Sequence, residues 1–268
     1  MDGMATYTHG HHESVLRSHR WRTAENSAAY LLPHLSSGAT VLDVGCGPGT
    51  ITADFATLVT PARVTALEVT DEALGLARTE IARRGLDNVD FVVGDVQALD
   101  FADDTFDVVH AHQVLQHLGD PVAALREMRR VTRPGGVVAV RDSDYRAFAW
   151  YPLLPGLDEW LELYETVARG NGGEPDAARH LLAWAHAAGF TEVTASSSTW
   201  LFATPEDRQW WGDMWAERVL ESAMAGTALR TNAATHADLR RISDAWRAWA
   251  DDHDGWLSLL HGELICRV

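Results

Sequence analysis

A short apolar segment followed by three alternating glycines constrains the fold of this chain more than any other feature. Val41–Val44 has the composition of a buried strand, and Gly45, Gly47 and Gly49 follow it. Glycine adopts a positive φ without strain and lets a ligand approach where a Cβ atom would collide. Thr50–Leu58 then has a helical pattern, so the loop amides are expected to face a pocket at a helix N-terminus, which suits a polar or anionic group. A tight turn without a ligand would use the same glycines, so the rest of the chain must separate these interpretations.

Residues 40–140 alternate short apolar segments with helical patterns of about three turns. This alternation predicts βαβ units and a parallel sheet. Such sheets bind ligands outside the carboxyl ends of their strands, near the point where the strand order reverses. The expected strands are Val41–Val44, Arg63–Leu67, Val89–Val93, Phe106–Ala111 and Val137–Val140, and the expected helices are Thr50–Leu58, Asp71–Arg84 and Pro121–Thr132.

The composition changes after Tyr145, where helical patterns rich in tryptophan dominate. Large aromatic residues such as Trp210, Trp211 and Trp215 suit a pocket for apolar or planar molecules, but their spacing within a helical turn or two favours the core of a helical insertion. Here we expect helices over Gly156–Arg169, Ala177–Ala188, Pro205–Ala225 and Ala237–Asp251, a strand over Val193–Phe202 and a last strand within Trp256–Val268.

Together these patterns predict an α/β fold with a Rossmann-like doubly wound sheet. The sheet is expected to be mostly parallel, with an antiparallel last strand and a helical insertion before that strand. A short amphipathic helix over Thr23–Leu32 would form part of an N-terminal helical lid. We see one domain with an elaboration rather than two independent domains.

The charge and cysteine content exclude several classes of protein. The chain has 38 acidic residues against 22 Lys plus Arg, a formal net charge of −16, which disfavours nucleic acid and anionic membrane surfaces as partners. Its two cysteines, Cys46 and Cys266, argue against a disulfide framework and fit a reducing cytosol. The sequence shows neither a signal peptide nor a membrane-spanning segment. We therefore expect a soluble cytoplasmic protein whose oligomeric state is open.

Three acidic residues fall at the ends of the first three predicted strands, namely Asp43, Glu68 and Asp95. A carboxylate at Glu68 can accept hydrogen bonds from both hydroxyls of a ribose, as in dinucleotide-binding folds. Asp95 can receive an exocyclic amine while Val96 packs against an adenine face. Solvation would explain one such acid, but three at the mouth of one sheet favour a nucleoside site.

With these residues the chain resembles the class I S-adenosylmethionine-dependent methyltransferases, and within them small-molecule enzymes of the ubiquinone/menaquinone-biosynthesis type. The resemblance covers about residues 40–140 and is specific through the combination of its motifs. These motifs are Leu42–Gly49, Glu68, Gly94–Val96, His112–Leu118 and Arg133–Gly136.

The resemblance implies S-adenosylmethionine as the cofactor. The glycine loop would cradle its methionine part, Glu68 its ribose and Asp95 its adenine, while His112 and Gln113 would lie near the transferred methyl group. The family more often has Asp where this chain has Glu68, and His117 has packing or helix capping as an alternative role. The implied cofactor residues are Asp43, Gly45, Cys46, Gly47, Gly49, Glu68, Val69, Asp95, Val96, His112, Gln113 and His117.

The same resemblance implies a division of residues 1–268 into parts of one methyltransferase domain. Residues 1–36 would form the lid, residues 37–145 the cofactor-binding core, and residues 146–268 a C-terminal part whose helical substrate cap spans about 205–252. The acceptor is expected to be a small molecule with an O, N or C nucleophile.

Alignment of the acceptor can lower the activation barrier by about 7–11 kcal/mol, whereas a positioned acid or base raises the rate about 10²–10⁴-fold. A general base is therefore optional. If one exists, the candidates are His112, Tyr145 and three residues of the N-terminal arm, His9, His11 and His12. The arm also fits a solvated tail, and zinc would need about four placed ligands; we expect no metal.

Three other functions stay open at this stage. A nicotinamide dehydrogenase shares the fold, but its fingerprint is G-x-G-x-x-G, and here the third glycine, Gly49, comes one position early. The cofactor pocket could also serve a cyclisation or rearrangement without methyl transfer. The third alternative is a non-catalytic binding module with the same fold, since a fold alone does not determine function.

Overall fold

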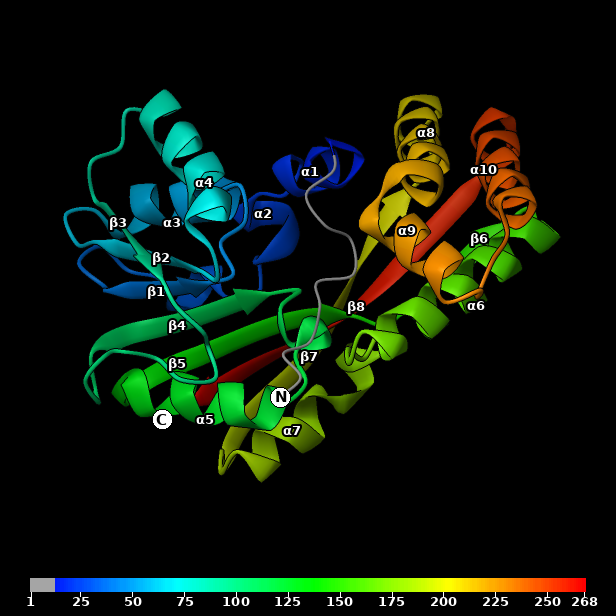
Figure 1. The fold of residues 1–268 in the computed structure, drawn as a ribbon. Coiled ribbons are helices and arrows are strands. Elements are labelled where there is room, and N and C mark those ends of the chain that lie inside the picture. The colour runs from blue at the N-terminus through cyan, green and yellow to red at the C-terminus, as the bar shows by residue number, and fades with distance from the viewer. Residues whose placement is uncertain (1–12) are drawn as a thin grey trace.

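A computed structural model of the chain describes residues 13–268 and is centred on one mixed sheet (Figure 1). The strands lie in the order β3-β2-β1-β4-β5-β8-β6, and β7 pairs with the other side of β8. The first five strands pair in parallel, and β6, β7 and β8 join antiparallel. The strands are β1 Val41–Val44, β2 Val64–Glu68, β3 Val89–Val93, β4 Phe106–His112, β5 Thr132–Ser143, β6 Ala149–Tyr151, β7 Glu192–Phe202 and β8 Trp256–Arg267.

This sheet confirms the predicted fold class and extends it. The chain runs outward from β1 to β3 and then returns to the other side of β1 as β4, so the strand order reverses between β1 and β4. A ligand site is expected at their carboxyl ends. The short strand β6 was not predicted, because only its pairing with Trp256–Ser258 of β8 makes it a strand.

Helices cover both faces of the parallel part of the sheet (Figure 1). One face carries α3 and α4, and the opposite face carries α5 and α7. Buried side chains from each helix layer pack against the alternate residues of the strands. These helices are α3 Thr50–Val59, α4 Asp71–Arg83, α5 Pro121–Val131 and α7 Leu181–Ala187.

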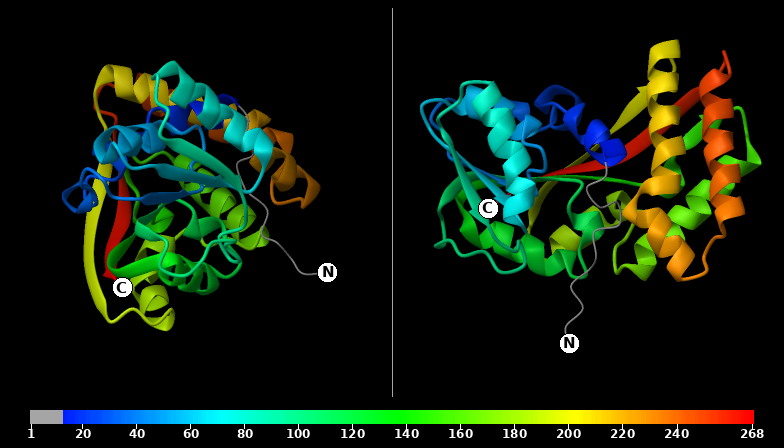
Figure 2. Two further views of the ribbon diagram at one scale, coloured as in Figure 1. Left: turned by 90° about the vertical axis from the view of Figure 1, so that its left-hand side faces the viewer. Right: turned by 45° about the horizontal axis from the view of Figure 1, so that its top comes forward.

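Four further helices form a separate layer beyond the sheet, with α8 and α10 side by side (Figures 1 and 2). They enclose a tryptophan-rich core in which Trp160, Trp246 and Trp249 are at most 1 % exposed. Trp211 and Trp215 belong to the same core and Trp210 packs against it, which confirms the core interpretation made from the sequence for these three tryptophans. The helices are α6 Pro155–Gly170, α8 Pro205–Glu221, α9 Ala223–Arg230 and α10 His236–Asp251.

Local sequence explains where several of these helices begin. The Thr204 side chain accepts a hydrogen bond from the amide of Asp207 and caps α8, and Pro205 fills the first helical position. Thr235 and Asp238 form a reciprocal capping box at the start of α10. Such caps satisfy backbone donors that have no partner inside the helix.

Three predicted helices were wrong in extent. The expected helix Pro205–Ala225 is two helices, because Ser222 leaves the helical conformation with ψ 172°. The first part of Ala177–Ala188 is a 3₁₀ turn, Ala177–His180, and precedes α7. The helix expected over Thr23–Leu32 covers only α2, Ala24–Ser27, because Ala28 turns the chain so that the side chain of Leu31 enters the core.

The N-terminal segment lies between the two helical layers. Helix α1, Glu13–Arg20, contacts α8, as Figures 1 and 2 show. Arg17 pairs with Glu217 of α8 at 3.1 Å, and Arg218 donates to the carbonyl of Ser14. The segment therefore connects the sheet layer with helix α8.

Candidate active site

A pocket opens at the carboxyl ends of β1, β2 and β4, where the strand order reverses. The loop after β1 and the ends of β2 and β4 form one end of it. Side chains of α1, α8, β7 and β8 form the other end, so the pocket runs from the sheet to the cap helices. Every predicted cofactor residue except Gly49 lines this pocket, and so does Tyr145.

The glycine loop has the backbone geometry that the sequence predicts. Gly45, Gly47 and Gly49 have φ of +65°, +53° and +79°. A Cβ atom on Gly49 would lie 2.8 Å from the Cα of Ala77, so this glycine is needed for helix packing. A Cβ on Gly47 would meet nothing within 4 Å. Gly47, which lines the pocket, therefore has open space at its Cβ position.

The first two strand-end acids hold the loop in place. Asp43 is 3 % exposed, its Oδ1 lies 2.8 Å from Nδ1 of His110, and its Oδ2 accepts a hydrogen bond from Thr52. Glu68 accepts one hydrogen bond from the amide of Gly47 and another from the amide of Val69, each at 3.0 Å. The carboxylate of Glu68 thus fixes the position of the loop while it lines the pocket.

His112 ends β4, lines the pocket with its ring centroid 5.8 Å from that of Trp200, and is 7 % exposed. Neither ring nitrogen has a hydrogen-bond partner within residues 13–268. Burial holds the pKa of His112 well below its usual value, and the nearby guanidinium groups of Arg22 and Arg141 lower it further. The imidazole is therefore neutral near pH 7 and presents one donor and one acceptor.

Gln113 follows with a φ of +54°, which is uncommon for a residue other than glycine. Its side chain accepts a hydrogen bond from Arg22 at 2.6 Å, and its Nε2 lies 2.9 Å from Nε2 of His261. Its backbone amide donates to the carbonyl of Arg141 at 2.7 Å. Contacts from three parts of the chain therefore hold this strained conformation at the pocket.

Two further predicted residues, His117 and Tyr145, line the pocket. Burial lowers the pKa of His117 to about 3, and its Nε2 lies 3.1 Å from Nε2 of Gln116. Burial raises the pKa of Tyr145, whose ring stacks on Tyr164 with centroids 3.9 Å apart. His9, His11 and His12 lie outside the described residues.

The sequence prediction missed several residues that line the cap end of the pocket, above all Arg22, Trp200 and Arg218. One signal was available, because Trp211, Trp215 and Arg218 follow the i, i+4, i+7 spacing that places residues on one helix face. Arg22 carries no such signal, since its place at the pocket depends on how the N-terminal segment packs.

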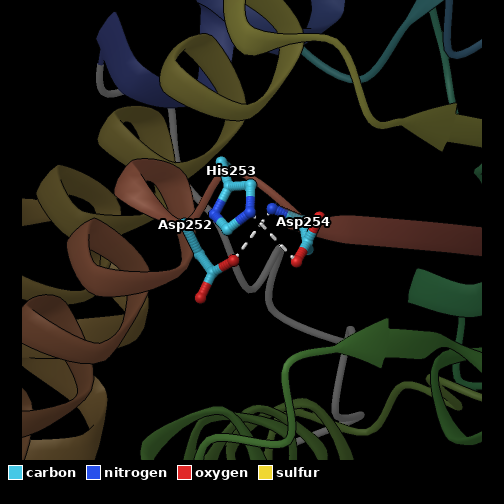
Figure 3. A group of neighbouring side chains, drawn as sticks. All are labelled: Asp252, His253 and Asp254. Carbon is cyan, nitrogen blue, oxygen red and sulfur yellow. Dashed lines mark hydrogen bonds and ion pairs between the residues drawn. The ribbon is translucent and has the colours of Figure 1, made fainter.

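Within residues 13–268, the one group with metal-ligand geometry is Asp252, His253 and Asp254 (Figure 3). It lies in the turn between α10 and β8, and none of the three residues lines the pocket. The side chain of His253 is 90 % exposed. Exposed acidic groups of this kind are common without a metal, so we assign no metal site to it. Among the described helices, none is long and apolar enough to cross a membrane.

Comparisons with known proteins agree with this geometry. A family model described as a methyltransferase domain matches residues 35–201. An uncharacterized methyltransferase of Schizosaccharomyces pombe is 36 % identical over 97 % of this chain and 95 % of its own length. The ubiquinone/menaquinone biosynthesis C-methyltransferase of Hahella chejuensis is 39 % identical over 52 % of this chain and 62 % of its own length. Among solved structures, the [4+2]-cyclase SpnF matches 93 % of this chain and 80 % of its own, with a TM-score of 0.53 and 26 % identity.

Proposed function

The chain belongs to the methyltransferase domain family and depends on S-adenosylmethionine, and on this premise we propose that it methylates an O, N or C nucleophile of a small, largely planar molecule. The donor would occupy the sheet end of the pocket and the acceptor the cap end. In this proposal residues 37–145 form the donor-binding core, and residues 205–252 cover the acceptor.

The residues at the sheet end fit the donor. Gly47 leaves space above the loop, where a Cβ atom would meet no protein atom within 4 Å. The carboxylates of Glu68 and Asp95 line the same part of the pocket. Glu68 would accept hydrogen bonds from the ribose hydroxyls, and Asp95 would receive the adenine amine. Val69 and Val96 supply apolar surface for the base.

The bound donor supplies a methyl group that its sulfonium has already activated. The protein therefore has to align a nucleophile and exclude water, and alignment alone can contribute about 7–11 kcal/mol. The aromatic walls Trp200, Trp211 and Trp215 would hold a flat acceptor. His112 is a neutral imidazole that lines the same pocket, so it can exchange a hydrogen bond with the acceptor at neutral pH.

The observation that carries this proposal is the continuity of the pocket. A single cavity is lined both by the loop and acids of the sheet end and by the aromatic side chains of the cap, with His112 and Gln113 at the junction. A site built only to bind the donor would not need the second half. The continuity supports methyl transfer over a non-catalytic binding role.

A second candidate function is a cyclisation in the same pocket. It is favoured by the similarity to the cyclase SpnF, whose structure covers most of this chain. The two functions differ in their products, since a cyclisation leaves the donor unconsumed.

The test is incubation with isotopically labelled donor and a panel of flat acceptors that carry a hydroxyl, an amine or an activated carbon. Methyl transfer yields S-adenosylhomocysteine and an acceptor heavier by one methyl group. Conversion of the acceptor with no S-adenosylhomocysteine would support cyclisation and exclude methyl transfer. His112→Gln should slow turnover, whereas His253→Gln, at an exposed turn, should leave it unchanged.

A further inference from the structure

The charged residues that line the pocket are segregated along its length. Its carboxylates, those of Asp43, Glu68 and Asp95, lie at the sheet end. At the cap end the described lining residues include two guanidinium groups, Arg22 and Arg218, and no carboxylate. The charged side chains that line the cap end within residues 13–268 are therefore cationic.

Both guanidinium groups are held against aromatic walls of the pocket. Arg22 lies over the ring of Trp200 at 5.6 Å from its centroid, and its Nη2 donates to Gln113. Arg218 lies over the ring of Trp215 at 4.5 Å, and its Nη2 donates to Ser18 at 2.9 Å. These contacts fix two positive charges beside the flat surfaces on which an aromatic acceptor would stack.

The charges of Arg22 and Arg218 affect the pKa values of other titratable groups in the pocket. Arg22 contributes to the low pKa values of His112 and His117 after the larger effect of burial. Arg218 and Arg22 both oppose the burial that raises the pKa of Tyr145. The field therefore disfavours added positive charge and favours negative charge in this space.

A polar group without a protein partner marks where an acceptor oxygen can bind. His112 lines the pocket, is more than nine-tenths buried, and has no hydrogen-bond partner for either ring nitrogen within residues 13–268. Buried polar groups are normally hydrogen-bonded, so the imidazole is suited to a ligand that supplies the missing partner.

Given the proposed function, we infer that the acceptor is a flat aromatic acid bound as its oxyanion, with its ring among Trp200, Trp211 and Trp215 and its negative charge facing Arg22 and Arg218. Phenolates, enolates and aromatic carboxylates share this chemistry. Amines that bind as ammonium ions are excluded from the cap end by the same charges.

The experiment is calorimetric titration of three naphthalene probes of similar size into the full chain saturated with S-adenosylhomocysteine. The probes are 2-naphthoate, 2-naphthamide and 2-naphthylmethylammonium. Naphthoate should bind at least about tenfold more tightly than naphthamide, and the ammonium probe should bind most weakly. The advantage of naphthoate should shrink as salt is added.

Matched variants assign the effect to the pocket. Arg22→Gln should weaken naphthoate binding about tenfold and leave naphthamide within about twofold. Arg17→Gln removes a guanidinium of the same segment that pairs with Glu217 and does not line the pocket, so it should change neither affinity. Arg218→Gln is expected to act like Arg22→Gln, and naphthamide binding reports whether its pocket is still folded.

Three results would overturn the inference: equal binding of naphthoate and naphthamide, tightest binding of the ammonium probe, or no binding of any probe. A loss of both affinities alike in Arg22→Gln would also overturn it. Failure of the proposed function looks different. If S-adenosylhomocysteine does not bind in the first titration, the donor site is wrong. If it binds but the labelled-donor reaction yields no methylated acceptor, methyl transfer is wrong, and the order of the probe affinities still tests the inference separately.

Discussion

Nη2 of Arg22 donates a hydrogen bond to Oε1 of Gln113 at a distance of 2.6 Å, although the two residues are 91 positions apart in the sequence. Gln113 in turn contacts His261 of β8. The N-terminal segment, the residue after β4 and the last strand therefore meet beside the pocket. The site depends on all three, although only Gln113 belongs to the motif-bearing part of the chain.

The open space at Gly47 gives a first prediction. Gly47→Ala should weaken S-adenosylmethionine binding by tenfold or more, because a methyl group would project into the space above the loop. The positive φ adds strain of about 1–2 kcal/mol. Gly38→Ala is the matched control, since Gly38 also has a positive φ, also has no neighbour within 4 Å, and does not line this pocket. Calorimetry should show that the control binds S-adenosylmethionine with normal affinity. Equal affinities in the two variants would show that Gly47 is not part of the donor site.

The carboxylate of Glu68 gives a second prediction. Glu68→Gln should lower donor affinity about 10–100-fold, because charge-assisted hydrogen bonds contribute about 1.5–3 kcal/mol. Glu72→Gln removes an exposed carboxylate from the first turn of α4 and should have no effect. The measurement is the Kd for S-adenosylmethionine by calorimetry. An unchanged Kd in Glu68→Gln would contradict the assignment of the ribose site.

Asp142 gives a prediction about pH. The residue is fully buried, and burial raises its pKa from 3.8 to about 7. Below about pH 4 the carboxyl is protonated in both the folded and the unfolded state. Between about pH 4 and 7 only the unfolded state ionises, so this residue lowers the free energy of unfolding as the pH rises, and the effect levels off above about pH 7.

Asp142→Asn removes that dependence. The difference in free energy of unfolding between the variant and the wild type should therefore grow in favour of the variant from pH 4 to pH 7, by about 2–4 kcal/mol. Urea unfolding at several pH values measures it. Asp158→Asn, at an exposed position of α6, should show no such trend. A flat difference for Asp142→Asn would mean that the carboxyl is ionised in the folded protein.

The buried ion pair between Arg141 and Glu263 gives a fourth prediction. Its atoms lie 3.2 Å apart and its side chains are 1 % and 7 % exposed. Glu263→Gln should destabilise the fold by about 3–5 kcal/mol, because it leaves a buried guanidinium without its counter-charge. Glu159→Gln breaks the exposed pair with Arg241 and should cost less than about 1 kcal/mol. Chemical denaturation measures the free energy of unfolding of both variants. Similar decreases in the two would show that Arg141 is solvated.

The parts of the fold that could be predicted from the sequence are those set by local pattern. The glycines after β1 need a positive φ, and the alternation of strands and helices leaves few topologies for a parallel sheet. The strand-end acids could be placed together because parallel strands bring their carboxyl ends to one edge. These rules were enough to predict which residues form the sheet end of the pocket.

The cap end could not be predicted, because long-range packing builds it. Arg22 reaches the pocket only through the contact of α1 with α8, and β6 is a strand only because β8 runs beside it. The tryptophans of α8 and α10 show helical spacing, but both Trp215 and Trp246 are in the core, and spacing did not reveal that Trp215 also lines the pocket. Only the crossing of the helices decides between them.

The central claim is that one pocket holds a methyl donor at Gly47 and Glu68 and a flat acceptor at the cap end. The most direct test is to quantify S-adenosylhomocysteine and methylated acceptor together by mass spectrometry in one reaction. The account predicts that the two form in equal amounts and fall together in Glu68→Gln. An acceptor converted without S-adenosylhomocysteine, or a yield that Glu68→Gln leaves intact, would contradict it.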